Sequence, residues 1–142
     1  VDLGENEIGD EGAIAVGNAL AVNASLKKLL LNDNSIGDQG AAAIGEGLKV
    51  NASLKELHLG ANSIGDEGAK ALASSLEVNA SLTILNLNLN QIGSSGATAI
   101  AKALEVNASL TTLGLQRNSI GDAAQGALRA SVEGRQGFSM YL

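Results

Sequence analysis

Residues 26–53 read LKKLLLNDNSIGDQGAAAIGEGLKVNAS, and close copies of this 28-residue segment lie on both sides of it. The copies share an asparagine that is followed two positions later by isoleucine and then by glycine; the asparagines are Asn6, Asn34, Asn62, Asn90 and Asn118. They also share the phrase Val-Asn-Ala-Ser-Leu, which occurs at residues 22–26, 50–54, 78–82 and 106–110. Self-similarity at a fixed period of this length is typical of a solenoid built from stacked repeats.

Two hydrophobic periods alternate within each unit. Leu29 and Leu31 have the two-residue period of a half-buried strand. Three apolar residues then follow at the spacing of a helix: Ala41, Ile44 and Leu48. Asp38 precedes these positions, and we expect its carboxylate to cap the helix that it opens. The equivalent residues are Asp10, Asp66, Ser94 and Asp122. Each unit is therefore predicted to be a short strand, a tight turn and a helix, with the Asn-Ala-Ser loop leading to the next strand.

One such unit cannot bury its own apolar face, whereas stacked units can. Parallel strands lie about 4.8 Å apart, but packed helices need about 8–10 Å between their axes. The predicted fold class is therefore α/β: a solenoid or horseshoe segment with a parallel β-sheet on the concave face and α-helices on the convex face. We expect one core layer to hold Leu26, Leu29, Leu31, Ile36, Ile44, Leu48 and Val50.

The spacing L-x-x-L-x-L-x-x-N carries a family resemblance. It occurs as Leu26, Leu29, Leu31 and Asn34, and again 28 residues later as Leu54, Leu57, Leu59 and Asn62. The chain resembles the leucine-rich repeat family, and its repeat length and helical half resemble the ribonuclease-inhibitor-like subclass. That subclass includes the repeat arrays of nucleotide-binding innate-immune receptors and the Ran GTPase-activating protein. The resemblance implies a horseshoe segment that acts in protein–protein interaction.

The chain is predicted to be a single domain over residues 1–142, with about five units. Residues 1–25 form a partial first unit, residues 26–121 the regular units, and residues 122–142 a degenerate closing unit. Phe138 and Tyr141 follow the 28-residue register of the strand leucines, so we expect them to cover the last aliphatic layer. The first layer shows no such adaptation. We expect it to be open, with self-association through this N-terminal end.

Composition excludes several functions. Nine Lys and Arg against fifteen Asp and Glu give a net charge of −6, which disfavours nucleic acid and anionic membranes as partners. The chain has no cysteine, so it has no disulfide framework, thiolate metal site or catalytic thiol. His58 is the only histidine and has no second ligand or nucleophile that recurs with it. We therefore predict no enzymatic activity, no metal and no cofactor.

A cytoplasmic location is expected, although four Asn-Ala-Ser sequons leave a secreted location open. These sequons begin at Asn23, Asn51, Asn79 and Asn107, and repetition of one loop accounts for them.

The concave face is the predicted binding surface, because its residues vary from unit to unit while the framework does not. Its candidate partner-binding residues are Lys28, Leu30, Asn32, Asp33, Glu56, His58, Ile84, Asn86, Asn88, Leu89, Thr112, Gln116 and Arg117. The predicted function is a protein–protein interaction module within a longer repeat protein, with a protein partner of unknown identity. The alternatives are a GTPase-regulating or enzyme-inhibiting repeat protein, and a consensus-like scaffold without a dedicated ligand.

Overall fold

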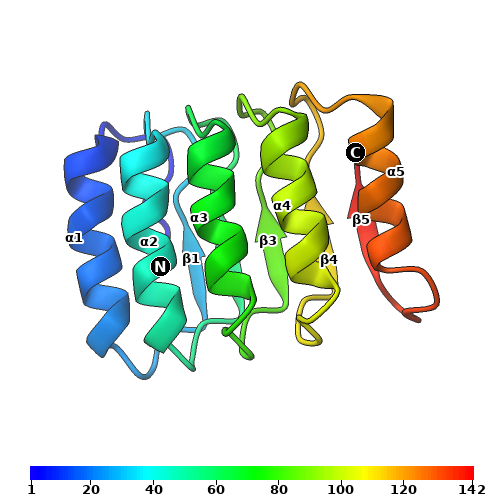
Figure 1. Ribbon diagram of the computed structural model, residues 1–142. Helices are drawn as coiled ribbons and strands as arrows, with labels where there is room; N and C mark the ends of the chain where they lie inside the picture. Colours follow the sequence, from blue (N-terminus) through cyan, green and yellow to red (C-terminus); the bar gives the residue numbers. More distant parts are fainter.

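A computed structural model describes residues 1–142 as five helices that alternate with five strands. The elements are α1 (Gly9–Val22), β1 (Lys28–Leu30), α2 (Asp38–Val50), β2 (Glu56–His58), α3 (Asp66–Leu76), β3 (Ile84–Asn86), α4 (Ser94–Leu104), β4 (Thr112–Gly114), α5 (Asp122–Ser131) and β5 (Ser139–Tyr141). The strands form one parallel sheet in chain order, and the helices stand side by side along one of its faces (Figure 1). The predicted α/β solenoid is confirmed. None of the five helices has the length and apolarity needed to cross a bilayer.

The core is a stack of aliphatic layers in strict register. Leu29 pairs with Leu57, and Leu57 pairs with Leu85, so the strand leucines form a continuous column. Thirty buried hydrophobic residues belong to this one core. In the predicted core layer, Val50 is wrong: it is the last residue of α2 and is 65% exposed. Leu26, in the outermost layer, is half-buried.

The repeated strand-end asparagines join each unit to its neighbour. The Nδ2 of Asn62 donates to the carbonyl of Leu31 in the preceding unit and to that of Leu59 in its own unit, both at 3.0 Å. Its Oδ1 accepts from the backbone N–H groups of Asn34 and Ile36, each at 3.0 Å. Asn62 is 6% exposed. The role of these asparagines is structural, because their bonds satisfy backbone groups that the bend leaves without partners.

A second asparagine ladder runs along the loops between helix and strand. The Nδ2 of Asn79 donates to the carbonyls of Leu48 at 2.8 Å and Asn51 at 3.1 Å, while its Oδ1 accepts from the N–H of Leu82 at 2.8 Å. Asn51 and Asn107 repeat this pattern and are equally buried. In three of the four sequon asparagines, the amide nitrogen to which a glycan would be attached therefore already donates hydrogen bonds within the chain.

The aspartates cap the helix of the following unit rather than their own. Oδ1 of Asp38 accepts from the N–H groups of Gly65 at 2.7 Å and Gly68 at 2.9 Å, at the start of α3. Helix α2, which Asp38 opens, receives no cap from Asp38. Oδ1 of Asp10 in the preceding unit accepts from the N–H groups of Gly37 at 2.7 Å and Gly40 at 2.9 Å instead. The predicted capping of the same helix is therefore wrong. The reversal also explains the glycine: a Cβ on Gly68 would lie 2.7 Å from Oδ1 of Asp38.

The closing unit contains a shift in register. Leu113 pairs with Met140 and Gly114 pairs with Tyr141, so the repeat from β4 to β5 is one residue shorter than the others. A shift of one residue exchanges the two faces of a strand. Met140 therefore packs against the core, while Tyr141 is 50% exposed. The predicted core position of Tyr141 is wrong, whereas Phe138 packs against the core as expected.

Arg135 takes the place of the loop asparagine between α5 and β5. Its Nη1 donates to the carbonyls of Leu104 at 3.2 Å and Asn107 at 3.0 Å, which are the positions that the asparagine of each earlier unit bonds. The guanidinium also lies 4.9 Å from the centre of the Phe138 ring, within cation–π range. The longer side chain thus reaches the last set of ladder carbonyls from a loop of different shape.

The first residues lie beside β1 and next to an apolar hollow. Residues 1–3 run beside β1, with the N–H of Leu3 bonded to the carbonyl of Leu30 at 2.9 Å. Beyond them lies an apolar hollow of about 160 Å³, whose lining includes Val1, Leu3 and Val16. Self-association through this end stays a prediction.

The reversed capping predicts where a substitution acts. Replacing Asp38 by alanine should lower the free energy of unfolding by about 0.5–2 kcal/mol, the usual effect of losing a helix cap. In hydrogen exchange, the amides of Gly65 and Gly68 should lose protection, while the start of α2 should not. The control is Asp122→Ala, because the carboxylate of Asp122 accepts no hydrogen bond from the N–H groups of a following helix. Faster exchange at the start of α2 instead would contradict the reversed capping.

Candidate functional site

The concave face, defined as the sheet face opposite the helices, carries the candidate residues. On β1 to β4 the central leucine points into the core and the flanking side chains point outward. All thirteen residues predicted to bind a partner are half-buried or exposed, and none is buried. They are therefore available to a partner.

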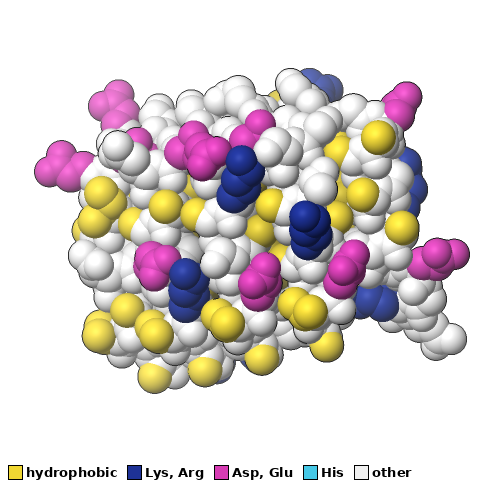
Figure 2. All heavy atoms as spheres, viewed as in Figure 1, with side chains coloured by type: hydrophobic (Ala, Val, Ile, Leu, Met, Phe, Trp, Pro, Cys, Tyr) yellow, Lys and Arg dark blue, Asp and Glu magenta, His cyan; other side chains and the backbone are white.

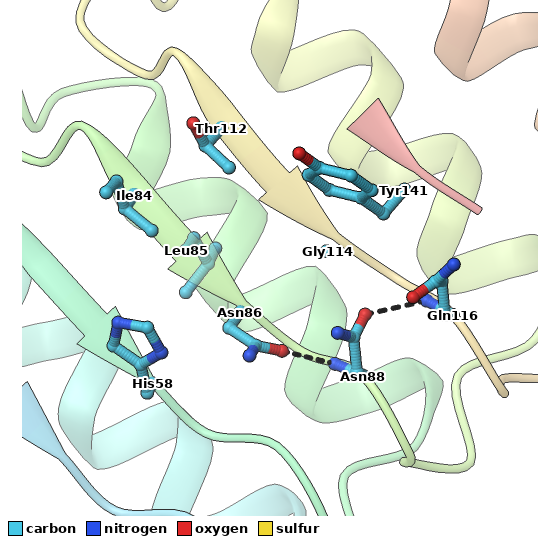
Figure 3. Close-up of a pocket in the computed structure, with 9 residues that line it drawn as sticks. All are labelled: His58, Ile84, Leu85, Asn86, Asn88, Thr112, Gly114, Gln116 and Tyr141. Carbon is cyan, nitrogen blue, oxygen red and sulfur yellow. Dashed lines mark hydrogen bonds between the residues drawn. The ribbon is translucent and has the colours of Figure 1, made fainter. Parts of the chain in front are cut away.

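A hollow of about 290 Å³ lies on this face over β2, β3, β4 and β5 (Figure 3). It brings together six of the predicted residues: His58, Ile84, Asn86, Asn88, Thr112 and Gln116. The other seven lie outside it: Lys28, Leu30, Asn32, Asp33, Glu56, Leu89 and Arg117. Sequence reasoning missed Leu85, Gly114 and Tyr141, which complete its lining.

Tyr141 reaches the hollow because of the short closing unit. Its ring lies beside Gly114, which has no side chain to occupy that space (Figure 3). A Cβ on Gly114 would lie 2.8 Å from Oδ1 of Asn88, so the backbone approaches that amide closely. The signal in the sequence was the length of the last unit. Counting from Asp122 to Ser139 shows one residue fewer than in the regular units.

Three side-chain amides on the concave face are held by backbone N–H groups. Oδ1 of Asn86 accepts from the N–H of Asn88 at 2.9 Å, and Oδ1 of Asn88 accepts from the N–H of Gln116 at 2.8 Å. Asn32 does the same with the N–H of Gly60 at 2.9 Å. Since the oxygen of each amide is occupied by a donor, its orientation is defined. The Nδ2 groups make no hydrogen bond within the chain and remain free to donate.

Charge is concentrated on β1 and β2. Nζ of Lys28 lies 2.9 Å from Oε2 of Glu56, and Nε2 of His58 lies 3.6 Å from the same oxygen. The hydrogen bond from Lys28 lowers the pKa of Glu56 below its ordinary value of 4.5, against a smaller opposing effect of desolvation. Nε2 of His58 is covered and has no hydrogen-bond partner. The concave face therefore has a charged half and a half lined by amides, Thr112 and Tyr141.

The turn after each strand holds a non-glycine residue in the left-handed region. The φ angles are 56° at Asp33, 53° at Ala61, 59° at Leu89 and 57° at Arg117. This conformation is costly for a residue with a bulky side chain. Leu89 is also 48% exposed, so its side chain gains little burial in return. Asp33, Leu89 and Arg117 were predicted to bind a partner because this position differs from unit to unit. That variation does not indicate a left-handed backbone.

No group of three or more His, Cys, Asp or Glu side chains is arranged to hold a metal ion. The arrangement offers amide donors, a hydroxyl, an aromatic ring and a charged cluster on an open surface. These groups suit recognition of another macromolecule.

The stacked units and their open sheet face define a solenoid repeat protein. The chain belongs to the leucine-rich repeat family: the family model described as "Leucine Rich repeat" matches residues 1–17, 22–45, 50–73, 78–101 and 106–124. No curated protein matches the sequence significantly.

Among solved structures, 58 chains match. One is the leiomodin-1 actin-binding site 2, with a TM-score of 0.80 and 29% identity over 93% of this chain and 75% of that one. Another is the C-terminal domain of tropomodulin from Caenorhabditis elegans, with a TM-score of 0.75 and 20% identity over 93% of this chain and 81% of that one. The second likeness supports the fold alone.

The ion pair on the concave face predicts a titration shift. Replacing Lys28 by methionine should raise the pKa of Glu56 toward 4.5, because the largest cause of its lowering is removed. Carbon-detected NMR of the Glu56 carboxyl group measures this pKa directly. Lys27→Met, one residue away, is the control and should leave the pKa unchanged. In the unsubstituted chain, the stabilising effect of the pair is present above pH 4.5 and is lost as pH falls through the lowered pKa.

The left-handed turn predicts a stabilising substitution. Leu89→Asn should raise the free energy of unfolding by about 0.5–1 kcal/mol, since asparagine adopts positive φ more readily than leucine. Leu89→Ala is the control in a urea titration: it removes the exposed side chain but keeps a Cβ-bearing residue that disfavours positive φ. If both substitutions raised the free energy of unfolding equally, the exposed leucine side chain rather than backbone strain would account for the increase.

Proposed function

We propose that the chain is a protein-interaction module that binds a protein partner through the concave face, with the Tyr141 hollow at the centre of the contact. The observation that carries the proposal is the set of oriented amides. Their free Nδ2 groups are donors at defined positions, and the carbonyl oxygens of a polypeptide are the complementary acceptors. Because Asn86 and Asn88 are already held, little side-chain entropy is lost on binding.

Tyr141 supports the same surface. Tyrosine is enriched among residues that dominate binding energy, because it combines a large apolar area with a hydroxyl. Here it is half exposed at the edge of a hollow that also contains Ile84 and Thr112. A rigid aromatic side chain next to fixed donors is the usual composition of an interaction centre.

Actin is the first partner to test, because a structure titled as an actin-binding site of leiomodin-1 shares 29% identity with most of the chain. Co-sedimentation with filamentous actin provides the test. Sedimentation that Tyr141→Ser abolishes would support actin as the partner, and its absence would exclude filamentous actin while leaving the concave-face proposal to the next experiment.

Photo-crosslinking tests the binding face itself. A photoreactive residue at Ile84, half-buried on the concave face, should capture a protein from native lysate, and Tyr141→Ser should reduce that capture at least tenfold (about 1.4 kcal/mol). The matched control places the same residue at Ser74, which is exposed on α3. Equal capture from both positions would overturn the proposal and favour the alternative of a scaffold without a dedicated ligand.

Two finer assignments are proposed with it. The 28-residue period supports the ribonuclease-inhibitor-like subclass. A cytoplasmic location is supported by the buried sequons, because a glycan on Asn51, Asn79 or Asn107 would replace one of the two amide hydrogens that donate to the ladder carbonyls.

A further inference from the structure

The exposed valines form a ridge along one edge of the solenoid. Val22, Val50, Val78 and Val106 recur every 28 residues at or just after the ends of α1 to α4, and they are 86%, 65%, 62% and 67% exposed. Figure 2 shows hydrophobic side chains gathered in a row along the lower edge of the molecule, where the helices end. We call these four residues the valine ridge.

Each ridge valine is followed two positions later by an exposed alanine, which widens the apolar strip. Between Val78 and Val106 the strip is hollowed, with Ala80 and Ala108 in the lining. None of the four valines belongs to the core. Single exposed apolar residues are ordinary, but a contiguous apolar strip on a folded surface is typical of an interaction site.

Charge along this edge divides into two halves. The first half carries Lys27, Lys49 and Lys55, while the second half carries Glu77, Glu105 and Glu133, and all six are exposed. Lys49 pairs with Glu46 at 2.8 Å, but the other five form no salt bridge within the chain. Fewer charges of the opposite sign lie within about a turn of the helix ends: Glu46 in the first half, and Lys102 and Arg129 in the second. The net charge along the valine ridge is therefore positive in the first half and negative in the second.

We propose that the valine ridge is a self-association surface whose occupant is a second copy of this chain, related by a two-fold axis that reverses the order of the units. Reversal brings Val50 of one copy to Val78 of its partner and Val22 to Val106. It also brings the positive half of each edge to the negative half of the other. A surface that is complementary to itself in this way is what a two-fold dimer requires.

This surface goes beyond the proposed function and leaves the concave face free. The strip is narrow, so the buried area is expected on the order of 1,000 Å² and the dissociation constant in the micromolar range. Paired modules would present two concave faces to a partner, which raises avidity without any new contact.

Sedimentation velocity of the full chain from about 1 to 200 µM tests the association. A dimer should form, and its dissociation constant should rise several-fold between about 0.05 M and 0.5 M salt, because screening weakens the ion pairs. Val50→Thr with Val78→Thr removes apolar surface at exposed positions, and it should raise the dissociation constant at least tenfold. A monomer over the whole range would overturn the proposal.

Charge exchange tests the pairing of the two halves. The variant Glu77→Lys with Glu105→Lys makes five of the six edge charges positive, leaving only Glu133 negative, and Lys49→Glu with Lys55→Glu makes five of them negative, leaving only Lys27 positive. Each alone should dimerise at least tenfold more weakly than the original chain, while an equimolar mixture should form a heterodimer. Weak homodimers that do not recover on mixing would contradict the two-fold arrangement.

Two controls separate this surface from others. Glu11→Lys with Glu67→Lys, and Lys70→Glu with Arg117→Glu, make the same changes in net charge at exposed positions away from the ridge. Each control variant alone should self-associate about as strongly as the original chain. If an equimolar mixture of the two control variants formed a heterodimer as stable as that of the two edge variants, the proposal would be overturned. Val1→Asp places a charge at the apolar hollow of the N-terminal end. If Val1→Asp abolishes the dimer and the threonine variants do not, the N-terminal end rather than the ridge holds the second copy.

Discussion

The fold depends on side-chain amides that bond the backbone of a neighbouring unit. Asn62 and Asn79 each donate to a carbonyl 31 residues earlier. The backbone carbonyls at the bends of one unit therefore depend on side chains of the next unit for their hydrogen bonds. A buried backbone group without a partner costs about 1–3 kcal/mol. In the regular units the 28-residue period is consequently strict, because one residue more or fewer would move the amides of that unit away from the carbonyls that they bond.

The same constraint explains the glycines and acidic residues beside the helices. Asp10, Asp38 and Asp66 each reach forward to two N–H groups of the next helix. A helix can approach that carboxylate only if its third residue lacks a Cβ, which is why Gly40, Gly68 and Gly96 occupy this position. The cap is thus a contact between units, and it contributes to stacking as well as to the helix.

Periodicity in the sequence was sufficient for the fold but not for every side chain. The leucine columns, the order of the elements and the outward position of the candidate residues were predictable, because a two-residue and a 3.6-residue period define which faces are buried. Capping was predicted for the wrong helix because the local rule considers one helix at a time. Val50 was placed in the core because its repetition resembled that of the core leucines. The orientation of the Asn86 and Asn88 amides has no counterpart in any sequence pattern.

The missing residue of the closing unit links the end of the fold to the candidate site. It moves Met140 into the leucine column and turns Tyr141 onto the concave face, next to Gly114. The loop that results has no asparagine, and the longer side chain of Arg135 bonds the ladder carbonyls of Leu104 and Asn107 instead. A closing unit of regular length would place Tyr141 in the leucine column and leave the hollow without its aromatic ring. The aromatic side chain of the candidate site is therefore a consequence of the shorter step from β4 to β5.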